Sequence, residues 1–223
     1  MRVILFGATG MVGQGVLREC VLDPEVTAVL SVVRRASGPE LGRRSEKVRE
    51  LITDNFHDFS KVEAQFAGYD ACFFCLGVSS IGMKEPEYRR VTYDIAMAAA
   101  SAVSRMNTGM TLVHVSAAGA DSTERGRAMW ARVKGETENA VLRMPFKSAY
   151  VFRPGLIIPM HGIQSKTGLY RVIYGGLRPI LPLLLRAFPK HVTTTEQIGL
   201  AMLRVAKHGY SKQVLESGDI ASV

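Results

Sequence analysis

Three glycines near the start of the chain have the spacing of a phosphate-binding loop. Gly7, Gly10 and Gly13 form a G-x-x-G-x-x-G pattern between the apolar run RVILF and a predicted helix. Glycine lets the backbone turn tightly and approach a pyrophosphate, and the helix N-terminus adds free N–H groups and the positive end of its dipole. A strand before the loop and a helix after it are the context that a dinucleotide site requires. The pattern therefore predicts dinucleotide binding; the alternative is an ordinary turn between a strand and a helix.

Two adjacent arginines stand where the second predicted strand ends. In dinucleotide-binding folds an acidic residue at this point binds the ribose 2′-hydroxyl of NAD, and none is present here. The guanidinium groups of Arg34 and Arg35 can instead hold a 2′-phosphate through paired hydrogen bonds. The sequence thus predicts NADP(H) as the preferred cofactor, with NAD(H) as the second choice. The alternative is that both arginines are solvated surface charges.

A second candidate site lies in the stretch SAAGADSTERGRAMWARVKGE, residues 116 to 136. Ser116 ends an apolar run, and Trp130 and Lys134 stand four residues apart in a predicted helix. Positions i and i+4 of a helix share a face, so the indole and the ammonium group are expected to lie together. Each of the three side chains can donate a hydrogen bond. The stretch is either an active site, the remnant of one, or ordinary helix packing.

Short apolar runs alternate with helical stretches along the chain and indicate the elements that carry these residues. Strands are predicted at 2–7, 26–33, 47–53, 70–77, 109–116 and 147–154. Helices are predicted at 11–22, 58–68, 85–106, 127–144 and 193–209. Several strands are apolar at nearly every position, which is typical of a parallel sheet covered on both faces. The alternation predicts an α/β fold with a doubly wound parallel sheet, that is, a Rossmann fold.

The expected domain organisation is one Rossmann core over residues 1–155 and a small C-terminal helical lobe, 156–223, packed on it as part of a single domain. Within the lobe, Thr194 and Gln197 form a capping-box pattern, and Gly209 is a plausible C-cap. The apolar stretch 170–188 is interrupted by arginines and prolines, which argues against a membrane-spanning helix. It is expected to pack on the sheet, to form a homodimer face, or to contact a membrane surface.

These motifs resemble the short-chain dehydrogenase/reductase superfamily, and in particular its atypical branch with a GATGxxG loop. TDNF after the third strand, CLG at 75–77, VSAAG at 115–119, VKGE at 133–136 and RPG at 153–155 extend the resemblance over most of the chain. Within this branch the chain is similar to the Tat-interacting-protein-like group and to bacterial NAD-dependent epimerases. The loop pattern and the resemblance together imply these cofactor-binding residues: Gly7, Thr9, Gly10, Met11, Val12, Gly13, Arg34, Arg35, Asp54, Asn55, Leu76, Gly77, Lys134 and Arg153.

The resemblance also implies catalytic roles for Ser116, Trp130 and Lys134. In that superfamily a Tyr-x-x-x-Lys pair does the proton transfer: the Tyr is the general acid/base, and the Lys lowers its pKa and hydrogen-bonds the nicotinamide ribose. Here Trp130 takes the Tyr position, and an indole cannot hand over a proton. Trp130 is therefore an aromatic wall, a core residue or an N–H donor. Replacement acids are sought in Tyr88, Tyr93 and His114, the last being equally well a core histidine.

Two functions agree with these features. The first is an NADP(H)-dependent oxidoreductase or epimerase acting on an apolar carbonyl substrate, whose identity the sequence does not reveal. The second is a catalytically weak or inactive regulatory protein that senses NADP(H). The superfamily contains both kinds of protein, so the fold alone does not decide between them.

The composition indicates a folded protein whose basic surface would favour anionic partners, although solubility accounts for most of the charge. Of the 223 residues 47% are hydrophobic, and the formal net charge is +8. The positive residues are scattered and form no nucleic-acid motif, so nucleic acid is not expected as a partner. Cys72 and Cys75 form C-x-x-C inside an apolar strand, where positions three apart face opposite ways; we expect buried thiols and no metal site. The opening apolar run is too short for a signal peptide, and a cytoplasmic location is expected.

Overall fold

The computed structural model describes residues 1–36, 45–163 and 191–223, and their core is a seven-stranded parallel sheet. The strand order is β3-β2-β1-β4-β5-β6-β9. The strands are β1 (Arg2–Phe6), β2 (Ala28–Val33), β3 (Val48–Ile52), β4 (Ala71–Phe74), β5 (Thr111–Val115), β6 (Ser148–Arg153) and β9 (Val214–Glu216). The order reverses at β1, which pairs with β2 on one side and β4 on the other. The predicted doubly wound Rossmann sheet is confirmed.

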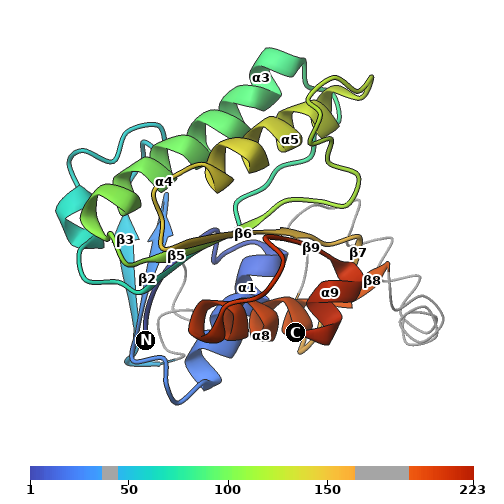
Figure 1. Cartoon of the computed structure of the whole chain (residues 1–223). Helices are drawn as coiled ribbons and strands as arrows, with labels where there is room; N and C mark the ends of the chain where they lie inside the picture. Colours follow the sequence, from blue (N-terminus) through green and yellow to red (C-terminus); the bar gives the residue numbers. More distant parts are fainter. Residues whose placement is uncertain (37–44, 164–190) are drawn as a thin grey trace.

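Helices cover both faces of this sheet (Figure 1). One layer contains α3 (Glu85–Arg89), α4 (Ile95–Met106) and α5 (Met129–Leu142); the other contains α1 (Met11–Leu22), α8 (Thr195–His208) and α9 (Ser217–Ser222). A separate pair of short strands, β7 (Leu156–Ile158) and β8 (Val192–Thr194), lies beyond β6. None of the helices in the described ranges combines the length and the apolar composition needed to cross a membrane.

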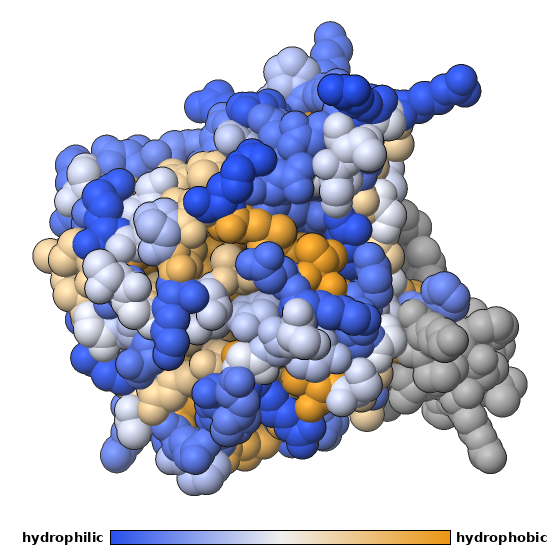
Figure 2. Space-filling model, in the orientation of Figure 1, coloured by the Kyte–Doolittle hydropathy of each residue, from blue (hydrophilic) through white to orange (hydrophobic). Residues whose placement is uncertain are grey.

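The alternation of side chains along the strands produces one apolar core on each face of the sheet. In β1, Val3 and Leu5 belong to the core under α1 and α8, whereas Ile4 and Phe6 belong to the core under α4. The same alternation separates Cys72 from Cys75, which pack into opposite cores. The prediction that this C-x-x-C pair faces both ways is confirmed. In the orientation of Figure 1, hydrophobic residues reach the surface in patches at the level of the sheet, between polar helix layers (Figure 2).

Two of the predicted helices differ in the structure. The helix expected over 85–106 is continuous in direction but contains a π-helical turn, Arg90–Asp94, between α3 and α4. The helix expected over 58–68 is reduced to a single 3-10 turn, Glu63–Phe66. In the observed fold Phe59 and Phe66 both pack against Phe6, with ring centroids 5.6 and 6.0 Å away.

The described part of the C-terminal segment shares the core and the sheet of the rest of the chain. Strand β9 pairs with β6 as the seventh strand of the sheet. Helix α8 crosses α1 so closely that a Cβ atom on Gly15 would lie 2.6 Å from the Cβ of Thr195. The boundary expected at residue 155 therefore divides elements that share one core. A three-residue strand has too short a pattern to be recognised in the sequence.

The predicted ends of α8 are confirmed. The amide of Gln197 donates to Oγ1 of Thr194 at 3.0 Å, and the amide of Thr194 donates to the Gln197 side chain at 2.9 Å. Gly209 ends the helix with a φ of +73°, a conformation that favours glycine. The stretch 170–188, for which sheet packing, a homodimer face and membrane contact were expected, lies outside the described residues.

Candidate active site

The glycine loop after β1 folds tightly onto the first turn of α1. Gly7 has a φ of +86°, and a Cβ on it would lie 2.7 Å from the carbonyl carbon of Cys75. Any Cβ on Gly13 would overlap the carbonyl oxygen of Gly7. Gly10 is the N-cap of α1 and offers no side-chain cap, so the first-turn N–H groups remain available to an anion. The loop therefore has the open, close-approach backbone that a pyrophosphate needs.

The remaining loop residues lie around this turn. Thr9 is half-buried and its carbonyl accepts a hydrogen bond from the Gln14 side chain at 3.2 Å. Met11 and Val12 are half-buried in the first turn of α1. Leu76 and Gly77 follow directly after β4, where the amide of Cys75 donates to the carbonyl of Phe6 at 2.9 Å. The structure thus joins the loop after β1 to the segment after β4.

The other predicted cofactor residues lie at the same edge of the sheet. Arg34 and Arg35 directly follow β2, Asp54 and Asn55 follow β3, and all four are exposed. Because β1, β2 and β3 are parallel neighbours, their carboxyl ends meet at one edge. The structure brings these residues to the glycine loop's side of the sheet. Contact of each one with a cofactor stays a prediction.

Ser116 follows β5 and is buried. Its amide donates to the carbonyl of Phe152 at 2.7 Å, which keeps it in line with β6. Its Oγ has no hydrogen-bond partner within the described residues. Buried hydroxyls normally have a partner, so this oxygen has the property expected of a group that binds a ligand.

Trp130 lies in the first turn of α5, above the loop that follows Ser116. A Cβ on Gly119 would lie 3.2 Å from Cη2 of the indole, and Gly119 has a φ of +85°. The loop therefore passes directly beneath the ring. This contact, together with the half-buried state of Trp130, places the aromatic side chain beside the segment that carries Ser116.

Lys134 lies one turn further along α5 and faces β5. Burial lowers the pKa of its ammonium group, and the charge of Glu138 opposes that change. The positive charge of Lys134 in turn acts on His114 of β5. The side chain is half-buried, so it lies between the helix and the sheet.

His114 behaves as a core histidine. It is buried and stacks on Phe74 with ring centroids 5.3 Å apart. Burial, and then the charge of Lys134, lower its pKa to about 3. The imidazole is therefore neutral at pH 7, and of the two expected roles the structure supports core packing.

The two tyrosines considered as replacement acids have other surroundings. Tyr88 is only 1% exposed, and burial raises the pKa of its phenol. Tyr93 lies beneath the guanidinium of Arg89, 4.1 Å from the ring centroid. Within the described ranges no hydrogen bond joins either phenol to Ser116, Trp130 or Lys134. The Trp130 position therefore has no phenol of its own and none supplied by these neighbours.

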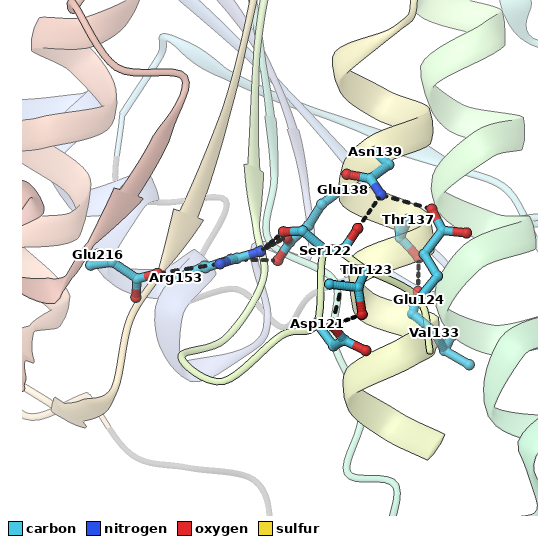
Figure 3. A network of polar contacts seen from close by, with 10 residues as sticks. All are labelled: Asp121, Ser122, Thr123, Glu124, Val133, Thr137, Glu138, Asn139, Arg153 and Glu216. Atoms are coloured by element: carbon cyan, nitrogen blue, oxygen red, sulfur yellow. Dashed lines mark hydrogen bonds and ion pairs between the residues drawn. The ribbon is translucent and has the colours of Figure 1, made fainter. Parts of the chain in front are cut away.

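Arg153 was expected at the cofactor, but in the structure its guanidinium contacts other residues (Figure 3). It pairs with the buried carboxylate of Glu138 and with Glu216, and Nη2 donates to Oγ of Ser122 at 2.6 Å. These contacts join β6 to α5, to β9 and to the loop after β5. The residue has a structural role in this network, and its contact with a cofactor stays untested.

Three residues of the site were not identified from the sequence. Asp121 accepts hydrogen bonds from the amides of Thr123 and Gly126 and so folds the loop before α5. Gly135 lets that loop approach the helix, because any Cβ there would overlap the carbonyl oxygen of Asp121. Glu138 is the buried partner of Arg153. A glycine in the middle of a helix costs stability, and that was the available signal.

Comparison with known proteins assigns the family. The family model described as "Semialdehyde dehydrogenase, NAD binding domain" matches residues 2–143. The chain belongs to this NAD-binding family. The match contains the glycine loop, Ser116, Trp130 and Lys134, so the NAD-binding domain includes both candidate sites. This agrees with the expected resemblance to short-chain dehydrogenases of the NAD(P)-binding Rossmann superfamily.

Individual relatives of this NAD-binding domain agree with the assignment. "Protein FMP52, mitochondrial" of Eremothecium gossypii is 26% identical over 232 residues, covering 100% of this chain and 97% of that protein. "Protein HTATIP2" of Rattus norvegicus is 27% identical over 180 residues, covering 78% of this chain and 71% of that protein. Among solved structures, Gre2 of Candida albicans in complex with NADPH has a TM-score of 0.72 at 15% identity, covering 98% of this chain and 78% of that chain.

These relatives correct the expected location. The sequence led us to expect a cytoplasmic protein because its opening apolar run is short. The FMP52 relatives are named mitochondrial, and they are 23 to 27% identical to this chain in Candida albicans and Saccharomyces cerevisiae. The cytoplasmic expectation is therefore contradicted. A short apolar run says nothing about routes into an organelle that do not use a secretory signal peptide.

Proposed function

We propose that this NAD-binding protein is an NADP(H)-dependent oxidoreductase that acts on an apolar carbonyl substrate. The observation that carries the proposal is the glycine loop, where Cβ atoms on Gly7 and Gly13 would clash with backbone and where the N-terminus of α1 is left without a side-chain cap. Arg34 and Arg35 at the end of β2 support the choice of NADP(H), because a guanidinium binds a 2′-phosphate well.

The chemistry of the proposed reaction divides between cofactor and protein. A bound nicotinamide supplies the hydride. Lys134 would hold the ribose, and the unpartnered Oγ of Ser116 would donate a hydrogen bond to the substrate oxygen. Trp130, lying over Gly119, would form an apolar wall that orients the carbonyl and excludes water. The proton for the product hydroxyl would come from Ser116 or from solvent, since the indole cannot provide it.

One observation favours a second function, that of an NADP(H)-sensing regulator with little or no turnover. The resemblance puts Trp130 at the Tyr position, Tyr88 is buried, the ring of Tyr93 lies beneath the Arg89 guanidinium, and His114 is neutral and buried. A protein with this arrangement would bind the cofactor and respond to its presence. The two functions differ in catalytic rate and agree in cofactor binding.

The first experiment titrates the protein with NADPH and with NADH while the fluorescence of Trp130, the only tryptophan, is recorded. Binding should quench the indole, and NADPH should bind about tenfold or more tightly than NADH if two charge-assisted hydrogen bonds to the 2′-phosphate are made. The double variant Arg34→Ala/Arg35→Ala should lose this preference while it keeps its affinity for NADH. An unchanged NADPH-to-NADH ratio in the variant would remove the arginines from the site, and absence of binding by calorimetry would overturn the proposal.

Turnover then separates the two functions. The protein is incubated with NADPH and with each member of a panel of apolar aldehydes and ketones. The oxidation of NADPH is followed by the loss of its absorbance. Oxidation that depends on both the carbonyl and Ser116 supports the oxidoreductase. Tight NADPH binding with no oxidation across the panel supports the sensor.

A further inference from the structure

The ion pair between Glu138 and Arg153 is buried, although burying two charges carries a desolvation cost. Its position beside the candidate active site suggests a function for it. Glu138 has a side chain that is 1% exposed, and that of Arg153 is 13% exposed. Nε of Arg153 donates to both carboxylate oxygens, at 3.1 and 3.0 Å, and Nη2 donates to Oε2 as well. Removing two charges from water costs several kcal/mol, which roughly cancels their attraction, so a buried pair is weak evidence for stability alone.

The place of Glu138 on α5 connects it to the candidate active site. Trp130, Lys134 and Glu138 are spaced four residues apart and so share one face of the helix. Lys134 lies in an environment poor in water, and Glu138 is the neighbouring charge that favours its protonated form. Among the described residues, the neutral His114 of β5 also faces Lys134, while Arg153 reaches this region from β6 through Glu138.

The same guanidinium also holds the loop that passes under Trp130. Nη2 of Arg153 donates to Oγ of Ser122, and Asn139 of α5 donates to the carbonyl of Ser122 at 2.9 Å (Figure 3). The loop is thereby attached at Ser122 to both β6 and α5. The segment from Gly119 to Ser122 cannot move away from the indole without breaking these bonds.

We infer that the Glu138–Arg153 ion pair is the positioning unit of the active site: it places a carboxylate one helical turn from Lys134 and fixes the loop beneath Trp130. Neither residue needs to touch substrate or cofactor for this role. The inference rests on the proposed function in so far as Lys134 serves a cofactor. It extends that function by assigning two residues that act through others.

The test measures the protonation of Lys134 without any cofactor. An amine-reactive acetylating reagent modifies the neutral amine only, so the rate of Lys134 modification as a function of pH, followed by mass spectrometry, gives its titration midpoint. Glu138→Gln removes the carboxylate charge, and the midpoint should move to lower pH. Glu136→Gln is the matched control, because Glu136 lies on the same helix and pairs with an arginine, Arg89, at 2.6 Å, yet lies off the Trp130–Lys134 face. In Glu136→Gln the titration midpoint of Lys134 should equal that of the parent.

A second readout uses NADPH. Lys134 loses its charge-assisted hydrogen bond when it deprotonates, so NADPH affinity should fall as pH rises, and in Glu138→Gln the fall should begin at lower pH. At a pH where Lys134 is still charged in the parent and neutral in the variant, the Kd of the variant should be about tenfold higher. Glu136→Gln should follow the parent curve.

A variant that fails to fold does not end the test. Glu138→Gln/Arg153→Gln removes both charges and leaves no unpaired buried guanidinium; the midpoint of Lys134 should still lie below that of the parent, but by less than in Glu138→Gln, because the positive charge of Arg153 is removed as well. An unchanged midpoint in the folded variants would overturn the inference. Absence of NADPH binding by the parent would instead contradict the proposed function, while the modification midpoints would still decide the role of Glu138.

Discussion

At the scale of single residues, the proposed site depends on Trp130 and Ser116. The indole lies over Gly119 and precedes Lys134 by one helical turn. Ser116 keeps a buried hydroxyl without a partner in the described ranges. Under the proposed function these groups would bind and orient the ligands, and the indole would stand where the superfamily has the phenol that transfers a proton.

Trp130→Tyr should introduce or increase carbonyl reduction, because the phenol would stand one turn from a cation that lowers its pKa. General acid catalysis typically contributes 10²- to 10⁴-fold, so a gain of about 100-fold in kcat is expected. Trp130→Phe is the control, since it also removes the indole but supplies no acid. If the two variants reduce the carbonyl panel equally slowly, the missing acid is not what limits turnover.

At the scale of elements, α5 depends on a glycine that lets the preceding loop lie against it. The carboxylate of Asp121 folds that loop by accepting hydrogen bonds from the amides of Thr123 and Gly126. The backbone carbonyl of Asp121 lies against Gly135, in the space that a Cβ would take. The loop and the helix together carry Ser122, Trp130 and Lys134. Their relative position is therefore set by a backbone contact, which side-chain patterns do not report.

Gly135→Ala should destabilise the protein although alanine favours helices. A Cβ overlapping the Asp121 carbonyl forces a backbone shift that costs about 1–3 kcal/mol, against a gain of about 1 kcal/mol in helix propensity. Urea unfolding should show a net loss of up to about 2 kcal/mol, together with weaker NADPH quenching of Trp130. Gly109→Ala, where a Cβ would meet nothing within 4 Å, should leave both properties near those of the parent. A stability equal to the parent would show that the loop relaxes freely.

At the scale of the whole molecule, an ion pair joins the ends of two helices that lie far apart in the sequence. Lys207 in the last turn of α8 binds Asp23, the C-cap of α1, with Nζ–Oδ2 at 2.7 Å. Burial alone would raise the pKa of Asp23, but the hydrogen bond from Lys207 and those from the amides of Glu25 and Val26 outweigh it, and the pKa is lowered. The pair joins α8 to α1, the first helix of the fold.

This lowered pKa makes a prediction about acid stability. A carboxyl group whose folded pKa lies below its unfolded value stabilises the protein above the unfolded pKa, and that contribution disappears as pH falls through the folded pKa. Asp23→Asn should therefore reduce the free energy of unfolding at pH 7 and make it less dependent on pH between about 5 and 2. Urea unfolding at several pH values measures this. Glu87→Gln, at an exposed position of α3, serves as the control and should keep the parent slope. Parallel curves for Asp23→Asn and the parent would exclude Asp23 from the acid response.

The sequence by itself determined the strands β1 to β6, helix α1, the capped helix α8 and the glycine loop. Each of these depends on neighbours within a few residues: apolar alternation, a capping box, or glycines where the backbone needs a positive φ or close approach. The opposite faces of Cys72 and Cys75 followed from the same local geometry.

Only the tertiary structure decided the use of Arg153, the neutral state of His114 and the place of β9. Glu138 and Glu216 reach Arg153 from 15 and 63 residues away, and no local pattern records such a pair. The pKa of His114 depends on burial by elements distant in sequence. Strand β9 can be recognised only in the folded protein, where it pairs with β6. Folding brings these groups together, because partners separated along the chain meet only when the sheet and its helices have been assembled.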